Sequence, residues 1–141
     1  MASLSLTRAL YVTALLLLAG CGPALRVALV GTPEVDSVLG KLELEKAEGE
    51  LLLLTAVLRE LPSPEKVHEE ATRFVAWIST GDEDPRVLGV LERDPLEREG
   101  RISATISERR FLFQVTAEDE AAPDQPSPHV VVRREVAADT K

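Results

Sequence analysis

The stretch Val38–Leu61, VLGKLELEKAEGELLLLTAVLREL, decides the fold. In its first half apolar and charged residues alternate, so that Leu42 and Leu44 share one face of the chain and the charged residues between them share the other. A period of two is typical of a half-buried β-strand. Glu48-Gly49 predicts a tight turn, after which the more apolar second half returns as the partner strand. The stretch therefore predicts a β-hairpin.

The chain on either side of this hairpin also consists of short apolar segments separated by turn residues, such as Gly31-Thr32-Pro33 and Pro62-Ser63-Pro64. Residues Asp119–Pro128 predict a longer loop rich in proline and acid. This organisation is typical of an all-β sandwich or barrel with about seven or eight strands. The expected strands cover residues 25–31, 38–47, 50–61, 73–80, 86–93, 100–107, 111–118 and 129–136.

One segment favours a helix nearly as well as a strand. Ser63-Pro64-Glu65 has the pattern of a helix start, with a capping residue, a proline at the first helical position and an acid in the first turn. Apolar residues then recur at helical spacing as far as Ile78. On local evidence, a helix over about residues 64–78 and a strand over residues 73–80 are both open.

The N-terminal segment has a composition of its own. Met1–Arg8 carries one positive charge and no acid, and Ala9–Leu18 is an uncharged apolar run. That run is about ten residues long, too short to span a bilayer, which takes roughly 20 apolar residues. It has the length of the apolar region of a secretory signal peptide. We expect a cleaved signal peptide over residues 1–20.

The end of this segment, Leu18-Ala19-Gly20-Cys21, resembles the lipobox of bacterial lipoproteins. In that family the cysteine sulfur receives a diacylglyceryl group before cleavage, and the new amino group is usually acylated afterwards. Cys21 is the only cysteine in the chain, so it forms no internal disulfide. The resemblance implies lipidation at Cys21 and a firm anchor, since two or three acyl chains hold a protein stably on a membrane. The alternative is an ordinary cleaved signal or an anchor helix, with Cys21 incidental.

The residue after the cysteine bears on localisation. Gly22 stands where lipoproteins retained at the inner membrane of enteric bacteria carry aspartate. We therefore expect a lipid-anchored protein of the cell envelope, on the periplasmic face, with the outer membrane favoured over the inner one. Removal of the signal peptide leaves about 120 residues, the size of one domain. We expect the lipidated cysteine and a short tether over residues 21–26, a β-sandwich over 27–136, and a frayed tail over 137–141.

The net charge of the chain limits the kinds of partner that it can bind. At a formal charge of −8, the surface repels nucleic acid and anionic headgroups, so we expect no nucleic-acid partner. The basic doublets Arg109-Arg110 and Arg133-Arg134 are too short to change this and are expected at solvated strand positions.

The second half of the chain carries a set of motifs that occurs in a known family. In order they are RFVAWI (73–78), LGVL (88–91), Gly100, FLFQVTAE (111–118), PSP (126–128) and VVV (130–132). As a set they resemble the extracytoplasmic C-terminal domain of anti-sigma-K-type factors, and also uncharacterised bacterial lipoproteins of the same layout, over roughly residues 38–136. The resemblance implies an immunoglobulin-like β-sandwich, with a helical turn near residues 64–69 and a strand from about residue 72.

The resemblance implies no catalytic or binding residue. Anti-sigma factors regulate through a cytoplasmic part joined by a spanning helix, and neither is expected here. A shared fold does not transfer function.

Candidate ligand-binding residues are few. The two histidines, His68 and His129, lie near acids in the sequence but lack a partner at metal-ligand spacing, so we expect exposed loop histidines and no metal or cofactor. The acidic clusters Asp82-Glu83-Asp84 and Glu118-Asp119-Glu120 lack the spacing of a calcium loop and are expected to be charged loop tips.

The sequence also contains no motif that indicates a catalytic site or a site for ligand stacking. No nucleophile motif is present, and we expect no enzyme. Thr116 and Glu118 share one strand face, where a solvated stripe is expected. The single tryptophan lies in an apolar strand and is expected to anchor the core between the sheets. The expected core anchors are Trp77, Phe74, Phe111 and Phe113.

Two functions follow from the sequence. The first is a non-enzymatic, membrane-anchored envelope lipoprotein whose sandwich is a structural or protein-interaction module, with another envelope protein as partner through a strand edge or loop tips. The alternative is a sensory or accessory module that binds a small ligand or ion through its acidic loops.

Overall fold

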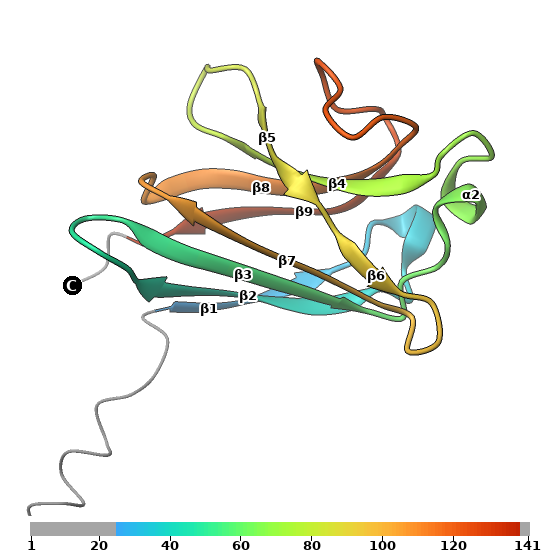
Figure 1. The fold of residues 1–141 in the computed structure, drawn as a ribbon, viewed down its shortest axis with the longest axis horizontal. Coiled ribbons are helices and arrows are strands. Elements are labelled where there is room, and N and C mark those ends of the chain that lie inside the picture. The colour runs from blue at the N-terminus through green and yellow to red at the C-terminus, as the bar shows by residue number, and fades with distance from the viewer. Residues whose placement is uncertain (1–24, 139–141) are drawn as a thin grey trace, which may run out of the picture.

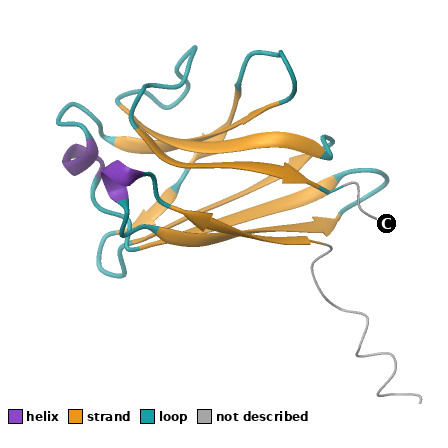
Figure 2. Cartoon of the chain, turned by 180° about the vertical axis from the view of Figure 1, so that it is seen from behind, coloured by secondary structure: helices purple, strands orange, loops and turns teal. Residues whose placement is uncertain are grey.

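The computed structural model describes residues 25–138, which form two β-sheets packed face to face (Figure 1). The expected signal peptide, Cys21 and the last three residues lie outside the described residues. The strands are β1 (Leu25–Val30), β2 (Leu39–Lys46), β3 (Leu52–Arg59), β4 (Arg73–Ser79), β5 (Arg86–Val90), β6 (Glu92–Asp94), β7 (Glu99–Ile106), β8 (Arg110–Glu118) and β9 (Val130–Ala137). Two short helices, a 3-10 turn (Pro33–Val35) and α2 (Pro64–Val67), lie at one end of the sandwich (Figure 2).

The strand order is that of an immunoglobulin-like sandwich. One sheet has the order β1-β2-β3-β7-β6 and the other β5-β4-β8-β9, and every pairing is antiparallel. The orders β2-β3-β7-β6 and β4-β8-β9 correspond to the ABED and CFG sheets of immunoglobulin domains, with β1 and β5 as additional edge strands. The expected all-β sandwich is confirmed, with nine strands in the described part of the chain.

The hairpin predicted from residues 38–61 is β2 and β3, paired from Leu39↔Arg59 to Lys46↔Leu52. Gly49 lies in its turn with a φ of 62°, a left-handed conformation that glycine adopts without strain. The segment over residues 64–80, for which the local sequence allowed either a helix or a strand, forms both in succession. The helix α2 ends at Val67, and β4 begins at Arg73.

The single strand expected over residues 86–93 is two strands in different sheets. β5 pairs with β4, and β6 pairs with β7. Between them the chain crosses from one sheet to the other at Leu91, whose side chain is buried and whose N–H donates to the Phe74 carbonyl at 2.9 Å. The crossing is visible in Figure 1 as the diagonal strand pair β5–β6. It closes that side of the sandwich.

The core between the sheets contains the apolar halves of the alternating strands. Leu42 and Leu44 are fully buried there, as the period of two predicts. Phe74, Phe111 and Phe113 also belong to this core. Their burial removes large apolar surfaces from water, which is the main favourable term in folding.

Replacement of Phe113 by alanine tests the core. The side chain is fully buried in the core, so Phe113→Ala should lower the free energy of unfolding by about 3–5 kcal/mol. Leu96→Ala is the control, because Leu96 is 92% exposed and its loss should cost less than about 0.5 kcal/mol. Urea unfolding followed by circular dichroism measures both. Equal stabilities would contradict the placement of Phe113 between the sheets.

Candidate functional site

Trp77 is buried on the face of the four-stranded sheet that points away from the other sheet. Its neighbours Ala76 and Ile78 belong to the core between the sheets, and successive side chains on a strand point to opposite faces. Trp77 is nevertheless only 1% exposed. The expectation that it anchors the core between the sheets is therefore corrected, because it anchors a second buried layer on the outer face.

The same alternation places polar residues of β8 in this outer layer. Phe113, Val115 and Ala117 face the core, so Thr116 and Glu118 face outward beside Trp77. Both are buried, and Glu118 is only 6% exposed. The solvated stripe expected from Thr116 and Glu118 is thus wrong. Loops that rise from the ends of β4 and β8 lie over this outer face (Figures 1 and 2).

A chain of hydrogen bonds runs through the outer layer. The Trp77 indole Nε1–H donates to Thr116 Oγ1 at 2.9 Å, and the Thr116 hydroxyl donates to Glu118 Oε2. The same carboxylate oxygen accepts the backbone N–H of Ser127 at 2.8 Å. Buried polar groups need such partners, because an unmade hydrogen bond in a buried site costs about 1–3 kcal/mol. The chain links the only tryptophan to the loop after β8.

Ser127 fixes the end of that loop against β8. Its hydroxyl donates to the Ala117 carbonyl at 2.8 Å and accepts the backbone N–H of His129 at 3.2 Å. The His129 carbonyl in turn accepts the N–H of Ala117 at 3.0 Å. The His129 backbone is therefore held by two hydrogen bonds, one to Ser127 and one to Ala117.

The helical turn α2 positions the second histidine. Ser63 occupies the N-cap position as expected, but its side chain makes no capping hydrogen bond to the helix backbone. Instead, the pKa of the Glu65 carboxyl is lowered by a hydrogen bond from its own backbone N–H and by the Ser63 hydroxyl. The N–H of His68 donates to the Pro64 carbonyl, and the His68 carbonyl accepts the N–H of Ala71. His68 is thus fixed where the chain turns from α2 toward β4.

The two histidines meet. Their ring centroids lie 4.1 Å apart, with an angle of 12° between the ring planes, so the imidazoles are stacked. Both residues are half-buried. The expectation of exposed loop histidines is corrected, because the loop after β8 returns past α2 and brings together residues 61 positions apart in the chain.

A pocket of about 190 Å³ adjoins the stacked pair. Carboxylates and one hydroxyl surround the imidazoles, and Glu118 is the buried member of the set. The residues that line the pocket are His68, Glu70, Ala117, Glu118, Asp119, Ser127, Pro128 and His129. We name this cavity the histidine pocket.

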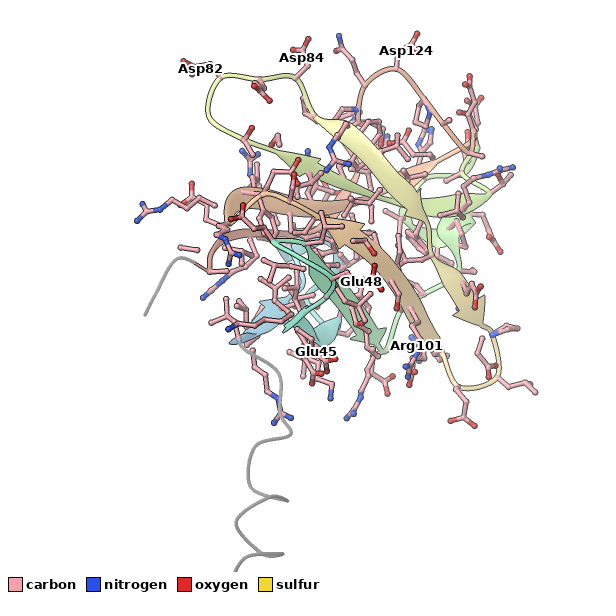
Figure 3. The ribbon with its side chains drawn as sticks, turned by 60° about the vertical axis from the view of Figure 1, so that its left-hand side comes forward. Glu45, Glu48, Asp82, Asp84, Arg101 and Asp124 are labelled. Atoms are coloured by element: carbon pink, nitrogen blue, oxygen red, sulfur yellow. The ribbon has the colours of Figure 1, made fainter. Side chains whose placement is uncertain are left out.

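The acidic clusters expected at loop tips do not form a cation site. Asp82 and Asp84 lie at the tip of the loop after β4 and point away from one another (Figure 3). In the second cluster Asp119 and Glu120 are exposed, but Glu118 is a buried residue at the end of β8, so its expected place at a loop tip is corrected. Within residues 25–138, no group of three or more histidine, cysteine or acidic side chains has the geometry to hold a metal ion.

A larger hollow of about 640 Å³ lies on the same sheet, beside Ser79, Arg110, Leu112 and Arg133. The doublet residues Arg133 and Arg134 are exposed on β9, and Arg109 is exposed in the turn before β8, in line with the expected solvated positions. No buried polar side chain faces this hollow. The histidine pocket is therefore the better candidate site, because it combines a buried carboxylate with a fixed pair of rings.

The fold and the pocket define a β-sandwich with a polar pocket beside the loop that leads into its last strand. Comparison with known protein families, with characterised proteins and with solved structures finds no match for this chain. The likeness to the extracytoplasmic domain of anti-sigma-K-type factors stays a prediction. No helix among the described residues is long and apolar enough to cross a membrane.

Replacement of Thr116 by valine tests the buried hydrogen-bond chain. Thr116→Val keeps the side-chain shape but leaves Trp77 Nε1–H without its acceptor and Glu118 without one donor. The free energy of unfolding should fall by about 1–3 kcal/mol. Thr105→Val, at an exposed position on β7, should change it by less than about 0.5 kcal/mol. Trp77 fluorescence in a urea titration measures both, and equal midpoints would refute a buried role for the Thr116 hydroxyl.

Proposed function

We propose that the protein is a non-enzymatic lipoprotein of the bacterial cell envelope, anchored through Cys21, that recognises another envelope protein with the end of its sandwich farthest from the anchor. The observation that carries this proposal is the placement of the two ends. The start of β1 and the end of β9 lie at one end of the sandwich, while α2 and the loop after β8 lie toward the other (Figures 1 and 2).

The lengths of the elements support a site held away from the bilayer. Three residues separate Cys21 from Leu25 at the start of β1, and the four steps from Cys21 to Leu25 allow a reach of at most about 14 Å. β8 runs from the anchored end toward the histidine pocket, and its nine residues span roughly 30 Å. A lipid at Cys21 would thus hold the sandwich near the membrane with its α2 end directed into the periplasm. We favour the outer membrane as the anchoring membrane.

The hydrogen bonds of the pocket support binding over catalysis. The Ser127 hydroxyl donates to a backbone carbonyl, and the nearest histidine contact it makes is with the backbone N–H of His129. A serine nucleophile requires a side-chain base that accepts its proton. The side chains of Glu118 and Ser127 are committed to fixing the loop, which suits a rigid recognition surface.

One observation favours the second function, a sensory or accessory module for a small ligand. The histidine pocket is concave and has a volume of about 190 Å³. In this alternative the ligand occupies the pocket, where it meets Glu118 and Asp119 of the second acidic cluster, and the loop tip with Asp82 and Asp84 takes no direct part. A protein partner touches the surrounding loops as well, so the two functions differ in whether the loop after β8 contacts a macromolecule.

The anchor is tested by replacing Cys21. Cys21→Ala should move the protein from the membrane fraction to the soluble fraction and abolish the incorporation of a labelled fatty acid. Retention in the membrane fraction, or an unacylated wild-type protein, would overturn the lipoprotein assignment. Leu25→Ala, which leaves the lipobox intact, is the control and should remain acylated.

The recognition surface is tested by crosslinking in intact cells. A photo-reactive amino acid at Glu120, in the loop after β8, should give a recurrent adduct with one envelope protein. The same amino acid at Glu48, an equally exposed glutamate in the hairpin turn at the anchored end, should not. Mass spectrometry identifies the adducts. Adducts from position 48 alone, or none from position 120, would contradict recognition through the far end.

A further inference from the structure

The carboxylates of the histidine pocket lack an ion pair in the part of the chain that the structure describes. None of the ion pairs seen among residues 25–138 involves Glu70, Glu118 or Asp119. Arg73 lies opposite Glu118 in the register of β4 and β8, but its Nε donates to Thr72 Oγ1 and it forms no ion pair with that carboxylate. A buried carboxylate is normally paired with a cation. Glu118, at 6% exposure, has two hydrogen-bond donors on one oxygen and no cation.

The stacked histidines add a second and independent property. The two imidazoles, parallel and 4.1 Å apart, both line the pocket. A planar group can continue such a stack, whereas a tetrahedral ammonium group cannot. Guanidinium groups are planar, stack on aromatic rings and donate paired hydrogen bonds to carboxylates.

The size of the pocket fits one side chain. A volume of about 190 Å³ corresponds to roughly six water molecules at about 30 Å³ each. That space admits a guanidinium group with its adjoining methylene groups and excludes a folded peptide segment. The carboxylates of the pocket and its stacked imidazoles therefore favour the same chemical group.

We propose that the histidine pocket binds the guanidinium group of an arginine side chain presented by the partner protein. The proposal rests on the proposed recognition function, since it names the chemistry of that partner. The arginine lies against the stacked imidazoles and donates hydrogen bonds to the carboxylates of Glu70 and Asp119, near the buried carboxylate of Glu118. The surrounding loops then contact the residues on either side of that arginine.

The single tryptophan makes the binding measurable in the purified full chain. Its indole N–H gives one resonance in a proton–nitrogen correlation spectrum, and it is joined to Glu118 through Thr116. Titration with N-acetyl-arginine amide should shift this resonance with a dissociation constant of about 1–10 mM, as suits one small ligand. N-acetyl-citrulline amide, planar but neutral, and N-acetyl-lysine amide, charged but not planar, should bind at least 10-fold more weakly.

Matched variants test whether the arginine derivative binds at the histidine pocket. Glu70→Gln with Asp119→Asn should weaken arginine binding at least 10-fold, whereas Asp82→Asn with Asp84→Asn removes the same charge from a remote loop and should leave it unchanged. Equal responses to arginine and citrulline, an equal loss in both double variants, or a shift with calcium or zinc chloride but none with arginine would each overturn the proposal. Because this titration needs no membrane, its failure would leave the anchoring and crosslinking results standing.

Discussion

The hydrogen bonds that Glu118 accepts from Thr116 and Ser127 organise the outer side of the sandwich. They are a consequence of burial on both faces of β4 and β8. These strands are central in a four-stranded sheet, with the other sheet on one side and two loops on the other. Once the outer face is covered, each polar group there needs an internal partner. Trp77 donates its indole hydrogen bond to Thr116, and Glu118 accepts a hydrogen bond from the loop that covers it.

The position of the histidine pocket depends on this arrangement. Ser127 is bound to Glu118 by its backbone and to Ala117 by its hydroxyl, so the loop can return only past the end of β8. His129 follows two residues later and meets His68 there. The pocket is therefore built on two short connections, each tied to a central strand, and a site supported in this way keeps its geometry better than one on free loops.

The edges of the two sheets show why the sandwich remains a discrete domain. An exposed strand edge can pair with another chain unless it is short, distorted, charged or covered. β6 has only three residues, and β5 meets β4 with a register shift at Trp77. β9 carries consecutive charges from Arg133 and also has a register shift. The end of β1 is covered, because Thr32 bonds by its N–H and its hydroxyl to the start of β9.

The sequence predicts the hairpin and the core phenylalanines, because each depends on a local period. The start of the helix before β4 has a local signal, but its short length was implied only by the family resemblance. Two features of the structure cannot be predicted from the sequence, for a physical reason. The crossing at Leu91 belongs to one continuous apolar run, and no local residue pattern there indicates a change of sheet. The stacking of His68 on His129 requires contacts that only the finished fold creates.

The outer layer around Trp77 could have been found from sequence. The run FVAWI in β4 is apolar at every position, and a strand without alternation is typical of burial on both faces. If β4 is covered on its outer face, its neighbour β8 is covered too, and Thr116 and Glu118 then cannot form a solvated stripe. The pattern of one strand alone does not show this layer, because burial of the outer face is shared between neighbouring strands.

Glu118 is the residue at which local rules and the finished fold disagree most. A carboxylate at the end of a strand ordinarily reaches water, and a buried one ordinarily finds a cation. Here it is buried by the loop that it fastens, and no residue among those described provides the counter-charge. Departures of this kind from local rules are expected at functional sites. The same carboxylate thus accounts both for the shape of the pocket and for the charge that it selects.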